Sequence, residues 1–375
     1  MHRSDAVEQT PWVLQLCHGY DGPFLDCARQ YAALFAGTRY RVCTVYLTGA
    51  ANEEVRQGSA SDEVIFLQYS SRDLRGLKLR AIRELSKLAA SRHFVTCIAH
   101  RFKPIYIALL GTSLPVIGVH HAFGVYGRPL RRLFINRFQS RLLLLGVSNA
   151  VRDEIRQQLP SWPAERIETL YNRIDVAAVQ AEQVSRELAR EHLGLPQGAW
   201  VVGNVGRLHP DKDQATLIRG FALALPNLPA GSLLAIMGNG RLEASLKSLV
   251  DELGVSASVR FLGQVPTGRR YFKAFDVFAL TSDREPFGMV LLEAMAAGVL
   301  LLAADCGGAP EVVGDVRALF PFGDAEALAD CLVGSSQSMA GVYSYEQKLH
   351  EHFSDEAVGR HVWQKSGLCS YFFKT

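Results

Sequence analysis

The chain has 375 residues, of which 48% are hydrophobic and 21% are charged, and its formal net charge is +3. A chain of this length can bury two separate cores, and its composition excludes a disordered or fibrous protein. The longest apolar runs, such as 142–147, are much shorter than the roughly 20 residues that a membrane span needs. We therefore expect a globular protein with two domains.

The first residues and the cysteines indicate a compartment. His2, Asp5 and Glu8 interrupt the segment in which a signal peptide has its apolar core. The seven cysteines contain no Cys-x-x-Cys pair, and their scatter is typical of reduced thiols in a core. These features predict a cytoplasmic protein.

Short apolar and β-branched segments alternate with segments of helical periodicity, a pattern typical of parallel sheets covered by crossover helices. The first set of predicted strands is 12–19, 40–49, 63–70, 94–100, 115–121 and 141–148. The second set is 200–208, 232–238, 259–265, 276–282 and 299–305. The pattern predicts an α/β protein with two doubly wound, Rossmann-like domains.

The domain boundaries follow from the segment between the two sets. Residues 176–198 are polar and helix-prone, so we place a first domain at 1–172 and a second at 173–353. A final helix is expected from Ser354, whose hydroxyl can cap it, with two acids near its positive end. We treat 354–375 as a separate C-terminal helical segment.

Charge is distributed unevenly between the two predicted domains. Residues 1–172 have a net charge of +8, and residues 173–375 have a net charge of −5. Within 72–141 there are 14 basic and 2 acidic side chains. The basic residues of a single helix could simply form a solvated surface. The whole basic stretch instead favours an anionic acceptor or an anionic lipid surface as the binding partner. Aromatic side chains are not interleaved with these charges, so nucleic acid is not an expected partner.

One helix and one later segment are expected to present this basic charge. Apolar residues at helical spacing predict a buried stripe along the helix, with basic residues opposite to it. The stripe comprises Leu74, Leu77, Ala81, Leu85 and Leu88, and the basic residues opposite to it are Arg72, Arg80, Arg83 and Lys87. Of these, Arg80, Arg83 and Lys87 are the residues expected to contact the acceptor or the membrane. The second basic group comprises Arg128, Arg131 and Arg132.

Two motifs in the second domain predict a pocket for a nucleotide sugar. Residues 205–212 read Val-Gly-Arg-Leu-His-Pro-Asp-Lys, and residues 285–293 read Glu-Pro-Phe-Gly-Met-Val-Leu-Leu-Glu. The second motif opens a helix near Gly288, whose first backbone N–H groups can bind a diphosphate. Glu285 precedes this helix and Glu293 lies about one and a half turns inside it. The two carboxylates are therefore expected to bind different parts of a ligand.

These motifs give the chain a resemblance to the family 4 retaining glycosyltransferases, which have the GT-B fold, and in particular to bacterial lipopolysaccharide-core enzymes. The resemblance covers most of the chain and is strongest from Gly146 to Asp305. It includes the segments 146–154, 171–175, 205–213, 237–240, 261–263 and 285–293. It implies two Rossmann-like domains facing a deep cleft, and a C-terminal helix that crosses back to the first domain.

The resemblance also implies roles for individual residues. Glu285 contacts hydroxyls of the donor sugar, and Glu293 holds the nucleotide ribose. Arg207 and Lys212 neutralise the diphosphate. The donor-binding set is completed by the backbone at Gly238 and by the N–H groups of Phe287, Gly288 and Met289. The residue types suit these tasks, because a carboxylate can accept two hydrogen bonds from a diol and a departing diphosphate needs fixed positive charge.

The family places a histidine near the reacting centre, at the end of a strand in the first domain. Here the strand from Pro115 ends in His120 and His121, and alternation along a strand points these two side chains in opposite directions. The sequence does not decide which of them faces the site. His100, at the end of the preceding strand, is a further candidate.

We expect neither a metal ion nor another cofactor. Asp211 and Asp213 form an Asp-x-Asp pair, the motif that holds manganese in glycosyltransferases of the other major fold. Lys212 between them would place a competing cation beside the metal. No His, Cys and Asp cluster with ligand spacing occurs elsewhere in the sequence.

The predicted function is metal-independent, retaining transfer of a hexose from a nucleoside-diphosphate sugar to a surface glycan or glycolipid, with lipopolysaccharide core as the specific acceptor. The predicted location is cytoplasmic and peripheral on the inner face of the membrane. Alternatives are another GT-B activity, such as a nucleotide-sugar epimerase or a small-sugar synthase, and a catalytically silent nucleotide-sugar-binding subunit. The base, the sugar, the linkage and the oligomeric state are left open.

Overall fold

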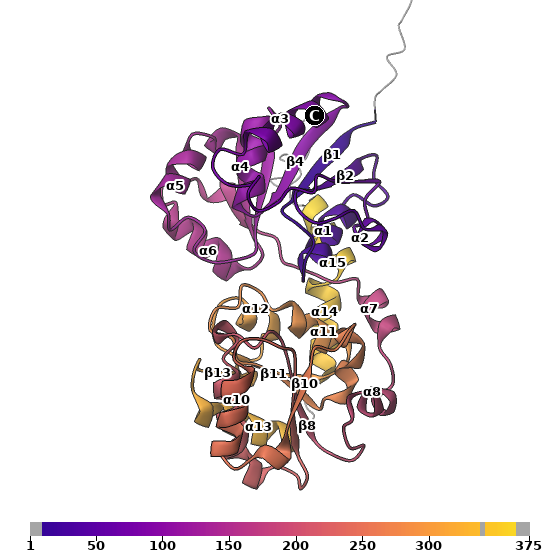
Figure 1. Cartoon of the computed structure of the whole chain (residues 1–375), viewed down its shortest axis with the longest axis vertical. Helices are drawn as coiled ribbons and strands as arrows, with labels where there is room; N and C mark the ends of the chain where they lie inside the picture. The colour runs from indigo at the N-terminus through magenta and orange to yellow at the C-terminus, as the bar shows by residue number, and fades with distance from the viewer. Residues whose placement is uncertain (1–9, 338–341, 365–375) are drawn as a thin grey trace, which may run out of the picture. The chain divides into compact units, whose positions relative to one another are not determined.

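The computed structural model describes residues 10–337 and 342–364. The chain forms two compact units (Figure 1). The first unit contains the described residues up to Asn172 and those from Val358 onward, and the second unit is Arg173–Ala357. Each unit is built around its own parallel sheet.

The first unit contains seven strands and the helices that connect them. The strands are β1 (Trp12–Cys17), β2 (Arg41–Tyr46), β3 (Glu63–Phe66), β4 (Phe94–His100), β5 (Val116–His120), β6 (Leu142–Gly146) and β7 (Ile167–Thr169). The helices are α1 (Phe24–Ala33), α2 (Glu53–Gly58), α3 (Leu79–Ala90), α4 (Phe102–Gly111), α5 (Pro129–Asn136) and α6 (Asn149–Gln158), joined near the end of the chain by α15 (Asp355–Gln364).

The sheet of the first unit has the order β3-β2-β1-β4-β5-β6-β7. Its central strands are buried because helices cover both faces, with α1 and α2 on one side and α3 and α4 on the other (Figure 1). Strand β6 reads Leu-Leu-Leu-Leu-Gly and every residue of it is buried, as expected for a parallel strand between two helical layers. The chain reverses its direction across the sheet at β1, which leaves a switch point between β1 and β4.

The second unit repeats this architecture. Its strands are β8 (Val201–Val205), β9 (Leu233–Met237), β10 (Val259–Gly263), β11 (Val277–Leu280), β12 (Leu300–Ala304) and β13 (Leu319–Phe320). Its helices are α7 (Val176–Glu182), α8 (Arg186–Leu193), α9 (Gln214–Ala224), α10 (Glu243–Glu252), α11 (Met289–Ala296), α12 (Ala309–Val313), α13 (Ala325–Gln337) and α14 (Val342–His352). The sheet order is β10-β9-β8-β11-β12-β13, so its switch point lies between β8 and β11.

The predicted α/β class with two doubly wound sheets is confirmed. Each strand of both predicted sets is present, although most are shorter than predicted at one end or both. Two short strands, β7 and β13, were not predicted. One side chain of the predicted apolar stripe was assigned wrongly: Leu77 is 66% exposed, because α3 begins only at Leu79. Leu74, Ala81 and Leu85 are each 1% exposed, as the stripe requires.

Two chain segments pair where the second unit begins and ends. Ile174 forms a parallel bridge with Ser354. Its N–H donates to Phe353 O at 3.0 Å, and Asp355 N–H donates to Ile174 O at 3.2 Å. Beside this bridge the buried guanidinium of Arg173 forms an ion pair with Asp355, with Nε 3.0 Å from Oδ1. The two segments that leave the second unit are therefore fixed to each other.

The C-terminal helix α15 begins as predicted, with Ser354 Oγ accepting from Ala357 N–H at 3.1 Å. Its residues from Val358 belong to the first unit. Val362 is 2% exposed, and Trp363 Nε1 donates to Leu34 O at 3.0 Å. The expected return of this helix to the first domain is confirmed. Residues 365–375 of the predicted segment lie outside the described residues.

Candidate active site

The switch point of the second sheet brings together the two motifs that the sequence singled out. Lys212 lies in the loop after β8, and Glu285 lies in the loop after β11, the neighbouring strand. Lys212 Nζ donates to Glu285 Oε2 at 2.7 Å. Ligands of doubly wound sheets bind at the carboxyl ends of strands beside such a switch point. The pair therefore marks the position at which a ligand of this unit is expected.

The structure assigns separate partners to the charged residues of the first motif. Asp213 caps α9, with Oδ1 accepting from Thr216 N–H at 3.3 Å. Asp211 lies 3.4 Å from Arg207 Nη2 and 2.5 Å from His209 Nδ1. Asp211 and Asp213 are thus engaged in local pairs, while Lys212 reaches across to Glu285. Arg207 is exposed, so its guanidinium can turn toward a ligand.

The loop after β12 holds Glu285 in place, a contact that sequence reasoning missed. Cys306 Sγ donates to Ser282 O at 2.8 Å, and Gly308 N–H donates to Glu285 O at 2.8 Å. A Cβ at Gly307, where φ is +59°, would lie 2.1 Å from Glu285 O. Glu285 is 8% exposed as a result of this packing. The signal in the sequence was the Cys-Gly-Gly segment directly after a predicted strand.

Gly238 directly follows β9 and lies against the loop that carries Arg207. Its φ is +139°, and a Cβ would lie 1.9 Å from Gly206 O. Gly206 N–H in turn donates to Met237 O at 2.9 Å. Only glycine allows this approach of two backbones, so Gly238 positions the start of the first motif.

The second motif opens a helix as predicted. Helix α11 begins at Met289, and Gly288 precedes it with φ +93°. Phe287 is 2% exposed and its ring meets that of Phe353 edge to face, with centroids 5.7 Å apart. Glu293 is partly exposed on α11. The structure thus places Glu285, Phe287, Gly288, Met289 and Glu293 along one turn and the helix that follows it.

His120, the last residue of β5, and His121, which follows it, have different surroundings. His120 is fully buried, and its Nε2 lies 2.9 Å from Tyr126 OH. His121 is partly exposed, and its Nε2 lies 3.1 Å from His100 Nδ1. The pKa of both His120 and His121 is lowered to about 3, mainly by burial and to a smaller extent by the neighbouring His121 and Arg101, respectively. Both rings are therefore neutral near pH 7, and His121 is the more accessible of the two.

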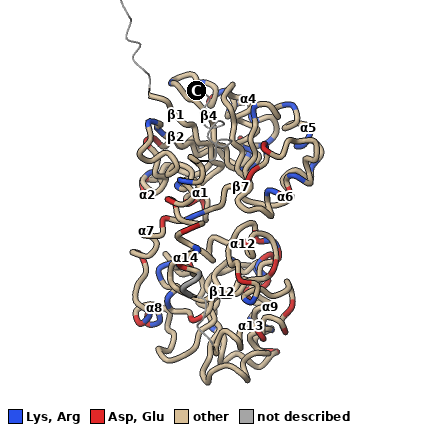
Figure 2. The backbone as a smooth tube through the Cα atoms, turned by 180° about the vertical axis from the view of Figure 1, so that it is seen from behind, with Lys and Arg blue, Asp and Glu red and all other residues tan. Residues whose placement is uncertain are grey.

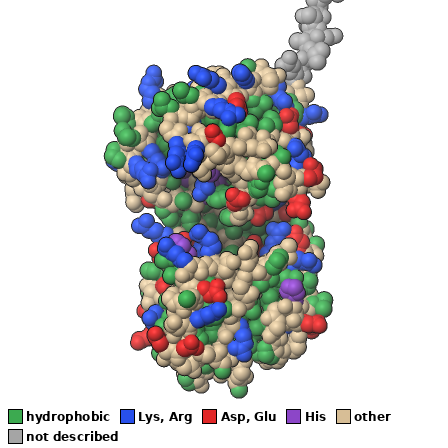
Figure 3. All heavy atoms as spheres, viewed as in Figure 1, with side chains coloured by type: hydrophobic (Ala, Val, Ile, Leu, Met, Phe, Trp, Pro, Cys, Tyr) green, Lys and Arg blue, Asp and Glu red, His purple; other side chains and the backbone are tan. Residues whose placement is uncertain are grey.

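The predicted basic residues of the first unit are mostly exposed. Figure 3 shows Lys and Arg side chains gathered over α3, α4 and α5, with hydrophobic side chains between them. Helix α5 carries basic residues and no acids (Figure 2), and its Leu130 and Leu133 are 80% and 71% exposed. Arg131 is engaged locally, because its Nη1 donates to Val125 O at 3.0 Å. On α3, Arg80 pairs with Glu84 at 3.0 Å.

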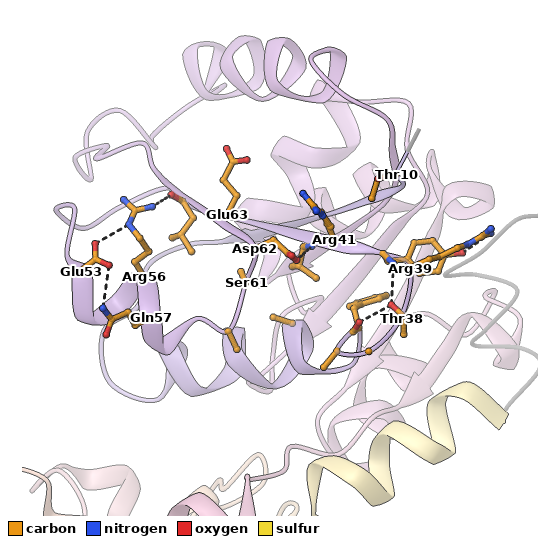
Figure 4. Close-up of a pocket in the computed structure, with 18 residues that line it drawn as sticks. Thr10, Thr38, Arg39, Arg41, Glu53, Arg56, Gln57, Ser61, Asp62 and Glu63 are labelled. Atoms are coloured by element: carbon orange, nitrogen blue, oxygen red, sulfur yellow. Dashed lines mark hydrogen bonds and ion pairs between the residues drawn. The ribbon is translucent and has the colours of Figure 1, made fainter. Parts of the chain in front are cut away.

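A hollow of about 870 Å³ lies in the first unit at the amino-terminal ends of β2 and β3 (Figure 4). Its charged side chains are engaged with neighbours. Arg56 pairs with Glu53 at 3.3 Å, and Asp62 Oδ2 accepts from Val42 N–H at 2.8 Å. Because ligands of such sheets bind at the carboxyl ends, we do not assign this hollow to the active site.

The described residues contain neither a metal cluster nor a membrane-spanning helix. No group of three or more His, Cys, Asp or Glu side chains in 10–337 and 342–364 is arranged to hold a metal ion. Within the same residues, none of the helices has both the length and the apolar character to cross a bilayer.

Comparison with known proteins confirms the resemblance that the motifs indicated. Residues 185–332 match the model of the family described as glycosyl transferases group 1. D-inositol 3-phosphate glycosyltransferase of Nocardia farcinica is 35% identical over 176 residues, which are 44% of this chain and 38% of that protein. N-acetyl-α-D-glucosaminyl L-malate synthase of Bacillus anthracis is 28% identical over 62% of this chain and 58% of that protein. The chain thus matches less than two thirds of the length of either relative.

A solved structure shows the same fold along nearly the whole chain. Anabaena Alr3699/HepE in complex with UDP has a TM-score of 0.77 and 19% identity, over 95% of this chain and 98% of that one. At this level of identity the likeness establishes the fold alone. The predicted GT-B fold is confirmed.

Proposed function

We propose that this chain, whose residues 185–332 match the group 1 glycosyltransferases, transfers a sugar from a nucleoside-diphosphate sugar to an anionic acceptor with retention of configuration. The observation that carries the proposal is the Lys212–Glu285 pair, 2.7 Å apart at the switch point of the second sheet. It puts a cation and a carboxylate where such sheets bind ligands. A nucleoside diphosphate needs the cation and a sugar needs the carboxylate.

Each residue of the site then has a defined task. Glu285 accepts hydrogen bonds from hydroxyls of the donor sugar, and Lys212 turns from Glu285 toward the diphosphate as the donor enters. Arg207 adds a second positive charge, because negative charge develops on the departing diphosphate. The N–H groups of Phe287 and Gly288, in the turn before α11, and of Met289, its first residue, are free to bind the same phosphate region in this proposal.

Binding of the nucleotide tests the proposal. We expect UDP to raise the melting temperature, since a ligand at about 100 times its dissociation constant adds roughly 2.7 kcal/mol. Glu293→Ala should weaken UDP about tenfold or more, because a hydrogen bond to a charged group contributes roughly 1.5–3 kcal/mol. Glu293→Gln, which keeps the length of the side chain, is the matched control. Stabilisation by no nucleoside diphosphate would refute the assignment of the site, and equal UDP affinity in Glu293→Ala would remove the ribose role.

We propose that the transfer requires no metal ion. The positive charge at the diphosphate comes from Arg207 and Lys212, while Asp211 and Asp213 are engaged with Arg207, His209 and the start of α9. We expect the transfer rate to be the same in EDTA and in manganese. Loss of activity in EDTA with recovery in manganese would contradict this and would assign Asp211 and Asp213 as ligands.

The acceptor is proposed to be anionic on two grounds. The two relatives are named for acceptors that are small anions, inositol 3-phosphate and malate. The first unit has a basic surface over α3 and α5. One candidate acceptor is lipopolysaccharide core, an anionic glycolipid, which would require this basic surface to contact a membrane. The other candidate is a free sugar phosphate or hydroxy acid, which would not require membrane contact.

Charge removal on α5 separates these two acceptors. Arg128→Gln with Arg132→Gln should lower binding to vesicles containing anionic lipid about 30-fold, since each basic residue near such a membrane contributes about 1 kcal/mol. Arg131 is left intact because it bonds to Val125 O. The matched control removes two exposed charges of the second unit, Arg219→Gln with Arg241→Gln. Equal vesicle binding by both double variants would show that α5 is an ordinary solvated surface.

Charge reversal on α3 examines the other basic group. Arg80→Glu, Arg83→Glu and Lys87→Glu together should raise the KM for an anionic lipid-linked acceptor while leaving UDP affinity unchanged. Vesicle binding and acceptor use as in the wild-type protein, over a range of salt concentrations, would exclude α3 from the acceptor surface.

A further inference from the structure

The first sheet has a switch point for which the proposed function gives no ligand. Strand β1 lies between β2 and β4 in the sheet order. The chain leaves β1 toward β2 and β3, and it returns on the other side at β4. The ends of neighbouring connections diverge at such a point and leave a crevice outside the carboxyl ends of the strands. In the second sheet the corresponding crevice carries the Lys212–Glu285 pair.

A small pocket occupies this crevice. Its lining comes from the end of β1, from α1 and its approach, and from the end of β4: Cys17, His18, Gly19, Phe24, Cys27, His100 and Arg101. The pocket has a volume of about 10 Å³. A cavity of that size holds about one water molecule. It can therefore take one oxygen atom of a ligand, while the rest of the ligand lies outside.

Two buried nitrogen atoms of the lining have no hydrogen-bond partner among the described residues. His100 is 3% exposed, and because its Nδ1 lies 3.1 Å from His121 Nε2, its Nε2 is the nitrogen left for a ligand. His18 Nδ1 is also buried and unpartnered. A buried polar group without a partner costs about 1–3 kcal/mol. A ligand oxygen in the pocket would remove part of that cost.

Positive charge surrounds the mouth of the pocket. Arg101 directly follows β4 and lines the pocket. Its guanidinium carbon lies 4.2 Å from the centre of the Phe24 ring. Burial lowers the pKa of His18, and the nearby charges of Lys103 and Arg101 lower it further, whereas Asp21 acts in the opposite direction. Arg101 and Lys103 are exposed, and within the described part of the chain neither forms an ion pair. Arg101 thus lines the pocket, the charge of Lys103 acts on His18 in the same lining, and neither cation is held in an ion pair among the described residues.

A chain of hydrogen bonds can place a donor inside the pocket. Cys27 Sγ lies 3.7 Å from His121 Nδ1, and His121 Nε2 lies 3.1 Å from His100 Nδ1. Burial lowers the pKa of both histidines, so each ring carries one N–H near neutral pH. If Cys27 donates to His121, then His121 donates to His100, and His100 carries its proton on Nε2. An anion at the pocket favours this arrangement of protons.

We propose that this pocket binds one oxygen of the acidic group, phosphate or carboxylate, of the acceptor. His100 Nε2–H contacts that oxygen inside the pocket, and Arg101 and Lys103 hold the charge at its mouth. Cys27 and His121 are positioning residues, since they act by fixing the proton of His100. The inference rests on the proposed function, in which the second sheet holds the donor and the first sheet is free for the acceptor.

Histidine side-chain NMR tests the site with inorganic phosphate and acetate as probes. Phosphate or acetate at up to about 10 mM should shift the His100 and His18 signals, since a dissociation constant of order 1 mM gives nearly full occupancy there. The probe that binds more tightly identifies the acidic group. Arg101→Gln and Lys103→Gln should each weaken that probe about tenfold. Arg75→Gln, which removes an exposed charge of the same unit, is the matched control and should have no effect.

The hydrogen-bond chain has its own readout. Cys27→Ala should weaken the probe and change the tautomer of His100, whereas Cys27→Ser keeps a donor and should preserve both. If neither probe shifts His100, or if Arg75→Gln acts as Arg101→Gln does, the inference is wrong. UDP should stabilise the wild-type protein and Arg101→Gln equally. Failure of UDP to stabilise either protein would refute the proposed function instead, whatever the histidine signals show.

Discussion

Replacement of Glu285 by alanine is expected to lower the turnover number about 100-fold or more, while UDP binds as tightly as before or more tightly. The carboxylate is 8% exposed and its partner is Lys212 Nζ at 2.7 Å. Removal of one fixed charge that stabilises a transition state costs roughly 10²–10³ in rate. Without Glu285, Lys212 loses its competitor for the diphosphate. Release of UDP from the donor sugar measures turnover, and calorimetry measures UDP affinity.

Glu285→Gln is the control for packing. The amide keeps the volume of the side chain in the loop that Gly307 and Gly308 contact, and it removes only the charge. We expect Glu285→Gln to lower turnover nearly as much as Glu285→Ala, because both variants leave the half-buried Lys212 charge unpaired. The glutamine should destabilise the fold less than the alanine, because it keeps the packing in the loop. Turnover close to that of the wild-type protein in Glu285→Gln would contradict a charge-based role.

Replacement of Gly238 by alanine is expected to have the largest effect on stability. The new Cβ would lie 1.9 Å from Gly206 O, and φ at this position is +139°. Backbone strain and overpacking each cost about 1–3 kcal/mol, so we expect a loss of roughly 2–4 kcal/mol in the free energy of unfolding. The displaced Gly206–Arg207 loop should also bind UDP less tightly. Denaturant unfolding and calorimetry measure the two effects.

Gly254→Ala separates the close contact from the backbone strain. Gly254 also has a positive φ, +69°, but no atom lies within 4 Å of a Cβ built there. We expect this variant to lose about 1 kcal/mol, the usual cost of a left-handed conformation for alanine, and to bind UDP normally. A loss in Gly238→Ala no larger than in Gly254→Ala would show that the Gly206 loop moves aside freely.

The architecture could be predicted because buried parallel strands carry a strong local signal. Segments such as Leu142–Gly146 are apolar throughout, and their alternation with helices excludes most other topologies. The short strands β7 and β13 escaped prediction because two or three residues carry no periodicity. Leu77 was misplaced because helical spacing does not reveal that a helix begins two residues later, at Leu79.

The residues of the candidate site could be named from the sequence, but their partners could not. In the sequence, Lys212 could form an ion pair with Asp211, Asp213 or Glu285. The fold selects Glu285, because β11 lies beside β8 in the sheet. The packing of Gly307 on Glu285 depends on two loops whose contact is set by the sheet. The choice between His120 and His121 likewise required a partner from elsewhere, Tyr126 for one and His100 for the other. Local patterns identify chemical groups, and tertiary structure pairs them.

The bridge between Ile174 and Ser354 has a consequence for how the protein is made. The second unit is one continuous stretch whose ends lie side by side, whereas the first unit needs residues from Val358 to be complete. On a ribosome that adds about 5–20 residues per second, the N-terminal part therefore waits roughly 10–40 s for α15 while Arg173–Ala357 is synthesised. The later unit can fold first, and the surface against which Trp363 packs stays open to chaperones until α15 has been synthesised.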